Sequence, residues 1–170
     1  MRKLSAFIIF SCLLSTVLFS CKSEEETPDV QETTPFVSYK FDGVEVVMDN
    51  VVGRRLLTTV PDLLTVQGSL DPSGLPRMYI STYDDSADLK DGRSVIANKA
   101  NIFKHQAKFW DITGKEQGTV YDSTELKIDY SKIEYFPGGV VSGTFSGVIR
   151  DGSKNEYTIS DGKFHVIVEN

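Results

Sequence analysis

The chain has few of the side chains from which most metal and nucleophilic sites are built. Its 170 residues include two cysteines, Cys12 and Cys21, and two histidines, His105 and His165. With no cysteine pair beyond residue 20 and no HExxH motif, neither a disulfide nor a zinc site is predicted there. P-loop, GxGxxG and GxSxG motifs are also absent, so no nucleotide-binding loop or nucleophile elbow is expected. We therefore predict a protein without catalytic residues and without a cofactor.

Basic residues are also in deficit. The chain carries 18 Lys and Arg against 24 Asp and Glu, a net charge of −6. Loss of residues 1–20, which contain Arg2 and Lys3 and no acidic residue, would leave 16 against 24, a charge of −8. An acidic chain is a poor partner for nucleic acid and for anionic lipid.

The N-terminus has the pattern of a secretory signal. Arg2 and Lys3 precede an apolar run from Leu4 to Phe19, which suits a signal-peptide core, and no stop-transfer charge cluster follows it. The sequence Leu18-Phe19-Ser20-Cys21 resembles the lipobox of bacterial lipoproteins, in which the cysteine is acylated and becomes the first mature residue. Phe19 is bulkier than the residue usual at that position. We expect residues 1–20 to be a signal peptide and Cys21 to anchor the chain to a membrane through lipid.

An acidic tether follows the cysteine. Residues 21–35 are rich in Glu, Thr and Pro and nearly devoid of apolar side chains, a composition that favours disorder. The run Lys22, Ser23, Glu24, Glu25, Glu26 resembles the export signal that sends lipoproteins of Bacteroidota to the exterior of the outer membrane. The alternatives are a solvated tether and an anchor that faces the periplasm.

Residues 36–170 form a single domain by length, and its alternating patterns predict strands. Asp42-Gly43 is a favoured two-residue hairpin turn. It sets Phe41 opposite Val44, Tyr39 opposite Val46, and Val37 opposite Met48, with Lys40 facing Glu45. The same reasoning at Asp161-Gly162 predicts a second hairpin. That hairpin pairs Ile159 with Phe164, Tyr157 with Val166, and Thr158 with His165.

Between the two hairpins the pattern continues in short strands. Leu126, Ile128 and Tyr130 alternate with polar residues, and the parity changes after them, which predicts a bulge near Ser131. Gly143 and Gly147 share a parity with buried positions, which favours close approach of a neighbouring element. The helix candidates are short and lie around 85–90 and over 94–103. The predicted fold class is all-β, an antiparallel sandwich or a small barrel, and the pattern does not distinguish the two.

Several segments share the pattern of a known family. The stretch GTFSGVIRDGSKNEYTISDGKFHV, residues 143–166, is similar to the ending of a family of small Bacteroidota lipoproteins of uncharacterised function. YKFDGVEVVM at 39–48, DLKDGRSV at 88–95 and ELKIDY at 125–130 also resemble that family. The resemblance implies a β-rich envelope lipoprotein, and it brings no catalytic residue with it.

Two sets of residues are candidates for binding. The adjacent aromatic pairs Phe109-Trp110 and Tyr135-Phe136 point to opposite faces if extended, so one ring of each is exposed unless both faces are covered. Exposed rings on a sheet suit sugars or partner proteins. The acidic stretch with Asp84, Asp85 and Asp88 is a weak calcium candidate that lacks EF-hand spacing, and a solvated loop is the preferred interpretation.

These observations favour a non-catalytic binding module on the outer membrane, exposed at the cell surface, with a glycan or a protein as partner. One alternative is a structural accessory subunit of an envelope complex. The other is a small hydrolase built on carboxylates. A concave patch around Trp110 would favour ligand binding, and a flat apolar face would favour docking.

Overall fold

The computed structural model describes residues 34–56, 62–70, 74–85, 87–101, 103–111, 113–119 and 124–169. All of them belong to the second of two compact units, Glu32–Asn170. The predicted signal peptide, Cys21, the export signal at 22–26 and most of the tether lie outside the described residues.

The described residues form eleven strands and one 3-10 turn, η1 (Lys99–Asn101). The strands are β1 (Phe36–Phe41), β2 (Val44–Met48), β3 (Asn50–Leu56), β4 (Asp62–Ser69), β5 (Arg77–Asp84), β6 (Ser94–Ala97), β7 (His105–Trp110), β8 (Glu116–Thr119), β9 (Leu126–Ile133), β10 (Val140–Arg150) and β11 (Glu156–Glu169). The predicted all-β class is confirmed. No helix among these residues has the length and apolar character needed to cross a membrane.

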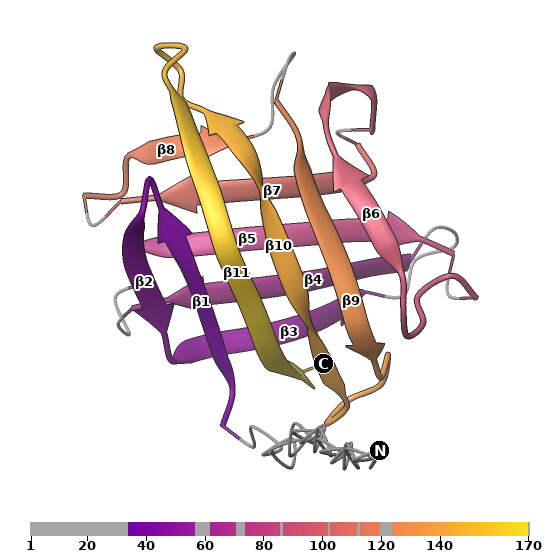
Figure 1. The fold of residues 1–170 in the computed structure, drawn as a ribbon. Coiled ribbons are helices and arrows are strands. Elements are labelled where there is room, and N and C mark those ends of the chain that lie inside the picture. The colour runs from indigo at the N-terminus through magenta and orange to yellow at the C-terminus, as the bar shows by residue number, and fades with distance from the viewer. Residues whose placement is uncertain are drawn as a thin grey trace, which may run out of the picture. The chain divides into compact units, whose positions relative to one another are not determined.

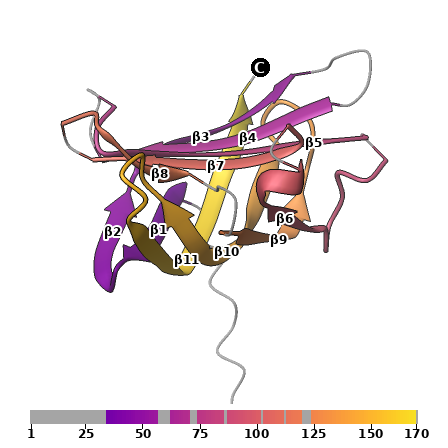
Figure 2. The same ribbon diagram turned by 90° about the horizontal axis from the view of Figure 1, so that it is seen from above.

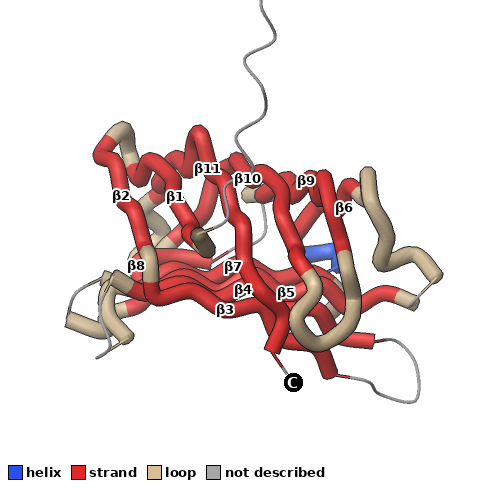
Figure 3. The backbone as a smooth tube through the Cα atoms, turned by 90° about the horizontal axis from the view of Figure 1, so that it is seen from below, coloured by secondary structure: helices blue, strands red, loops and turns tan. Residues whose placement is uncertain are grey.

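The strands make one curled mixed sheet that folds into two layers. The first layer has the order β2-β1-β11-β10-β9-β6, and the second has the order β3-β4-β5-β7-β8. The two layers face each other with their strands crossing at a steep angle (Figures 1 and 2), as in orthogonal sheet packing. At one corner the end of β11 pairs in parallel with β3, and at another Arg150 of β10 pairs with Thr119 of β8. The result is a half-barrel, intermediate between the sandwich and the barrel that the sequence left open (Figure 3).

The predicted hairpin at Asp42-Gly43 is confirmed in every pair. Strand β1 pairs with β2 in the expected register, from Val37 with Met48 to Phe41 with Val44. Asp42 and Gly43 have φ values of 46° and 82°, which a type I′ turn requires at both central residues.

The hairpin expected at Asp161-Gly162 is wrong. Strand β11 runs without interruption through this dipeptide and pairs with β1 on one side and β10 on the other. Asp161 has φ of 53°, and β11 contains one residue more than either partner at this point, which makes a bulge. The register beyond it changes accordingly: His165 lies opposite Ser142 and Phe36, and Thr158 lies opposite Val148.

Of the other local predictions, the bulge is confirmed and the two helices are wrong. The bulge near Ser131 is confirmed, because β9 skips that residue in its pairing with β10. The helix expected over 94–103 is wrong: the segment forms strand β6 and the short η1. No helix forms at the described positions of 85–90 either, where backbone hydrogen bonds make turns instead.

The core fills the space between the layers with side chains of alternating parity. Met78 and Ile80 on β5, and Ala107 and Phe109 on β7, are almost completely buried. Gly143 explains how closely β9, β10 and β11 pack, because an added Cβ would lie 2.2 Å from the Asp129 carbonyl oxygen and 2.7 Å from the Phe164 ring. The close approach predicted at this glycine is therefore confirmed.

Two hairpin turns have the same construction. In the turn after β7, the Asp111 carboxylate accepts hydrogen bonds from the backbone N–H groups of Thr113 (2.8 Å) and Lys115 (3.1 Å). In the turn after β10, Asp151 accepts from the residues at the same offsets, Ser153 (2.8 Å) and Asn155 (2.9 Å). The pKa of Asp111 is held below its usual range, first by the hydrogen bond from the Thr113 hydroxyl and then by these backbone N–H groups. At Asp151 desolvation raises the pKa, but the hydrogen bonds from the Asn155 side chain, the backbone and Tyr157 together outweigh it and lower the pKa.

The fourth residue of each turn is left-handed. It is Gly114 in the first turn, with φ of 80°, and Lys154 in the second, with φ of 71°. In both turns its N–H donates to the backbone carbonyl of the aspartate at 3.0 Å. The two turns therefore share the left-handed conformation at the fourth residue, which is glycine in one turn and lysine in the other.

Candidate functional site

A groove of about 680 Å³ lies on the face of the second layer that points away from the first. We call it the second-layer groove. Its floor is the outer face of β3, β4, β5 and β7, where the strand register aligns mostly polar residues in rows across the four strands. The rows are Asn50–Ser69–Arg77–Trp110, Val52–Gln67–Tyr79–Lys108 and Arg54–Thr65–Ser81–Gln106. Ten of these twelve residues line the groove.

Alternation along each strand places these side chains. Arg77 and Tyr79 alternate with buried Met78 and Ile80 on β5, so they point to the outer face. Gln106, Lys108 and Trp110 do the same on β7. The groove is therefore the polar reverse side of strands whose other side forms the core.

Hydrogen-bonding groups in the groove are held by their neighbours. The Asn50 side-chain amide donates to Ser69 Oγ at 2.8 Å, which links β3 to β4 at the start of the first row. Partial burial raises the pKa of Tyr79, an effect partly offset by hydrogen bonding to Ser81. The phenol thus stays protonated at neutral pH and is available as a donor.

Charge in the groove has one sign. Among the described lining residues Arg54, Arg77 and Lys108 are charged, and none is a carboxylate. The Arg77 guanidinium lies over the Trp110 indole, with its central carbon 4.4 Å from the ring centroid. This cation–π contact fixes the guanidinium, and it also covers that face of the indole.

A groove of similar volume on the outer face of the first layer differs in this respect. It is lined by Lys40, Lys163, Glu45 and Asp161 together with small polar residues. Lys40 pairs with Asp161 at 2.7 Å and lies directly opposite Glu45. The hydrogen bond from Lys40 lowers the pKa of Asp161, whereas the general acid of a carboxylate hydrolase needs a raised pKa.

The structure separates the four candidate aromatics. Phe109 is 1% exposed and packs against Tyr39 and Phe145 in the core, which corrects its place among binding residues. Trp110 points to the opposite face, as expected for adjacent residues in a strand, and lines the second-layer groove.

Tyr135 and Phe136 lie elsewhere. The Tyr135 hydroxyl donates to the backbone oxygen of Leu63 at 2.9 Å, and burial raises its pKa to about 12. That contact is at the end of β3 and β4 remote from Trp110, because β4 starts at Asp62 and Trp110 lies in the row of Ser69. Phe136 is 54% exposed and lines neither groove. The candidate aromatics therefore do not form one site.

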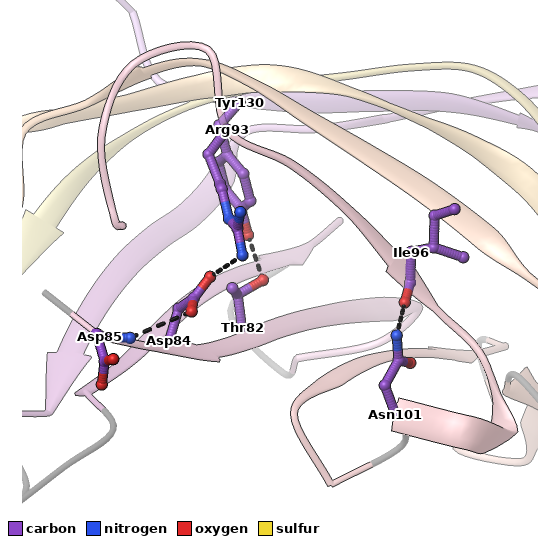
Figure 4. Close-up of polar contacts among 7 residues, drawn as sticks. All are labelled: Thr82, Asp84, Asp85, Arg93, Ile96, Asn101 and Tyr130. Atoms are coloured by element: carbon purple, nitrogen blue, oxygen red, sulfur yellow. Dashed lines mark hydrogen bonds and ion pairs between the residues drawn. The ribbon is translucent and has the colours of Figure 1, made fainter. Parts of the chain in front are cut away.

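The acidic stretch is used for internal contacts. Asp84 forms an ion pair with Arg93 and also accepts a hydrogen bond from the N–H of Asp85 (Figure 4). Asp88 donates its own N–H to the Asp85 carbonyl in a turn. Within the described part of the chain no three His, Cys, Asp or Glu side chains are arranged to hold a metal ion.

The same view shows how polar groups link the layers. Thr82 of β5 and Tyr130 of β9 share a hydrogen bond of 2.8 Å in the core (Figure 4). His105, opposite Thr82 on β7, is buried, and desolvation lowers its pKa despite the opposing effect of Asp84. Its Nδ1 has no hydrogen-bond partner among the described residues. The other histidine, His165, stacks on Phe36 and is half-buried.

Sequence reasoning found Trp110 and missed the residues around it. The alternation Arg77-Met78-Tyr79-Ile80 and Gln106-Ala107-Lys108-Phe109 was a signal that these polar residues share an outer face. It did not say that β5 and β7 are neighbours, because β6 and η1 intervene in the chain.

Comparison with known proteins adds no assignment. No protein-family model, curated protein or solved structure matches the chain. The class that the fold defines is an all-β protein with a curled mixed sheet, and its function has to be argued from the groove.

Proposed function

We propose that this protein is a lipoprotein of the small Bacteroidota family that its sequence resembles, and that it acts as a non-catalytic glycan-binding module at the cell surface. Acylated Cys21 would anchor it in the outer membrane, and the acidic run at 22–26 would direct it to the exterior. The observation that carries the binding role is the second-layer groove, which four strands build and which contains Trp110.

The chemistry of the groove suits a carbohydrate. Sugar hydroxyls both donate and accept hydrogen bonds, so they match neutral side chains such as Gln67, Tyr79 and Gln106. Drug-sized hydrophobic ligands prefer enclosed and mainly apolar cavities, whereas this groove is open and mostly polar. An extended ligand that lies along the sheet is the better fit.

Binding is tested with the purified acylated protein in detergent micelles on a glycan array. Trp110→Ala should abolish or strongly weaken every signal, because it removes the support for Arg77 and part of the groove wall. Phe136→Ala is the matched control, an exposed aromatic that lines neither groove. Equal signals from the Trp110 variant and the wild type would refute the assignment of the groove.

Surface display is tested separately by protease treatment of intact cells. The wild-type protein should be digested, and a variant with Glu24, Glu25 and Glu26 changed to alanine should be protected. Protection of both would place the domain on the periplasmic side.

A second candidate function is a structural subunit of an envelope complex, and one observation favours it. Strand β2 is an edge of the sheet, and its Val44 and Val47 are 68% and 51% exposed. Exposed edges invite pairing with another chain. A crosslinker placed at Val47 would then capture one defined partner in cells, and a control at Lys127 would not.

A further inference from the structure

We propose that the second-layer groove selects anionic oligosaccharides, whose carboxylate or sulfate groups pair with Arg54, Arg77 and Lys108. The inference rests on the proposed function, since it specifies the class of glycan. Three observations carry it: the sign of the charge in the groove, the support of Arg77 and the spacing of the three cations.

The charge of the groove departs from the rest of the molecule. The chain has an excess of acidic residues, and five cations elsewhere in the described residues are paired with carboxylates. Such pairs are Lys40–Asp161, Arg93–Asp84, Lys127–Asp129, Lys132–Glu134 and Arg150–Glu156. In the part of the chain that the structure describes, Arg54, Arg77 and Lys108 have no such partner. Three uncompensated cations in one groove create a local positive potential that a neutral ligand would not use.

The position of Arg77 favours the binding of an anionic group. Its central carbon lies over the Trp110 ring, and among the described residues no carboxylate pairs with its N–H groups, which can therefore make a bidentate contact with a ligand. Carboxylate and sulfate oxygens match that edge in geometry and charge. Because the indole already restricts the side chain, binding loses less conformational entropy there than at an unsupported arginine.

The spacing of the cations favours a ligand with several charges. Arg77 and Lys108 lie on adjacent strands and in adjacent rows, which puts their backbones about 8 Å apart by ideal sheet geometry. Arg54 lies on β3, two strands and two rows from Arg77, about 16 Å away by the same geometry. One small anion does not reach all three, whereas a chain of charged sugars does. Gln67 and Tyr79 lie between the cations and can meet the hydroxyl groups of the sugars.

The experiment measures the affinity of the acylated protein in neutral detergent by calorimetry. The probes are oligogalacturonate for carboxylate, a chondroitin sulfate fragment for sulfate with carboxylate, a neutral cello-oligosaccharide of matched length, and polyglutamate as a non-sugar polyanion. We expect an anionic sugar to bind at least tenfold more tightly than the neutral one, and its affinity to fall as salt rises from 50 to 300 mM. The stronger of the two anionic sugars identifies the charged group.

Single variants locate the effect. Arg77→Gln should weaken anionic binding about tenfold, since it removes a charge-assisted bidentate contact. Arg54→Gln and Lys108→Gln should each weaken it about threefold, because neither side chain is supported by an aromatic ring of the described residues as Arg77 is, and a single unsupported ion pair at a surface contributes less. Lys127→Gln, which removes an exposed cation on β9, is the control and should change nothing. All four substitutions are at solvent-facing positions, and thermal melts verify that the fold is kept.

Each outcome has one meaning. Equal affinity for the neutral and anionic sugars, unaffected by Arg77→Gln, would overturn the charge selection and leave glycan binding intact. Equal affinity for polyglutamate would overturn the selection of sugars. Absence of binding to every sugar would overturn the proposed function itself.

Discussion

The paired turns at Asp111 and Asp151 allow a test of backbone strain in which the protein supplies its own control. Lys154 occupies the left-handed position that Gly114 occupies in the other turn. A side chain in that conformation costs about 1–2 kcal/mol, and glycine offsets part of the gain by adding about 0.5–1 kcal/mol of unfolded-state entropy. Lys154→Gly should therefore raise the free energy of unfolding by about 0.5–1 kcal/mol, and Tm by roughly 2–4 °C.

The reciprocal change tests the same reasoning in the opposite direction. A Cβ added at Gly114 would lie 3.4 Å from the Leu75 side chain, an ordinary contact, so Gly114→Lys should lose a similar amount through the backbone alone. Urea unfolding and thermal melts of both variants measure the two effects. A Lys154→Gly variant no more stable than the wild type, or a Gly114→Lys variant of undiminished stability, would refute the argument.

Three further predictions concern the core and its response to pH. Gly143→Ala should lower the free energy of unfolding by about 3 kcal/mol through overpacking against strand β9, whereas Gly152→Ala, with nothing within 4 Å of the added carbon, should change the urea midpoint little. Thr82→Val should cost about 1–3 kcal/mol because it leaves the Tyr130 hydroxyl buried and unpaired, and the double variant with Tyr130→Phe should recover part of that loss in a double-mutant cycle. Because burial lowers the pKa of His105 in the folded state, the unfolded chain takes up the proton first as pH falls below about 6.5. Stability should decline in that window, and His105→Gln should flatten the decline when unfolding is measured from pH 7.5 to 5.

The residue pattern within a segment predicted its strands and turns well, but it did not predict which other strands the segment pairs with. Asp42-Gly43 and Asp161-Gly162 have the same turn chemistry, and each is flanked by alternating apolar residues. The first is a hairpin and the second is a bulge, because β11 has a partner on both sides and must extend through the dipeptide to reach both. Glycine is needed at position 162 in this bulge, because a Cβ there would lie only 2.3 Å from the Phe145 carbonyl oxygen. Aligning the residues on the two sides of a predicted turn gives no information about a third strand that pairs with either side.

The candidate site shows the same division. The prediction that Phe109 and Trp110 point to opposite faces is correct, because it depends only on the alternation of adjacent side chains in an extended chain. The residues around Trp110 come from β3, β4 and β5, and Arg54 is more than fifty positions away in sequence. Which polar faces of strands become neighbours depends on sheet order, and alternation within a strand does not determine that order.

The position of β11 in the sheet has a consequence for folding order. This strand pairs with β1, β10 and β3, and it follows every other described strand in the chain. As the polypeptide is made, the β1–β2 hairpin can form early, but it has no place to dock until residues 156–169 emerge. Non-local pairing of this kind delays folding, so the nascent domain stays open until its last strand arrives. For a chain that we propose is exported as a surface lipoprotein, such a late closing step would keep it competent for transport.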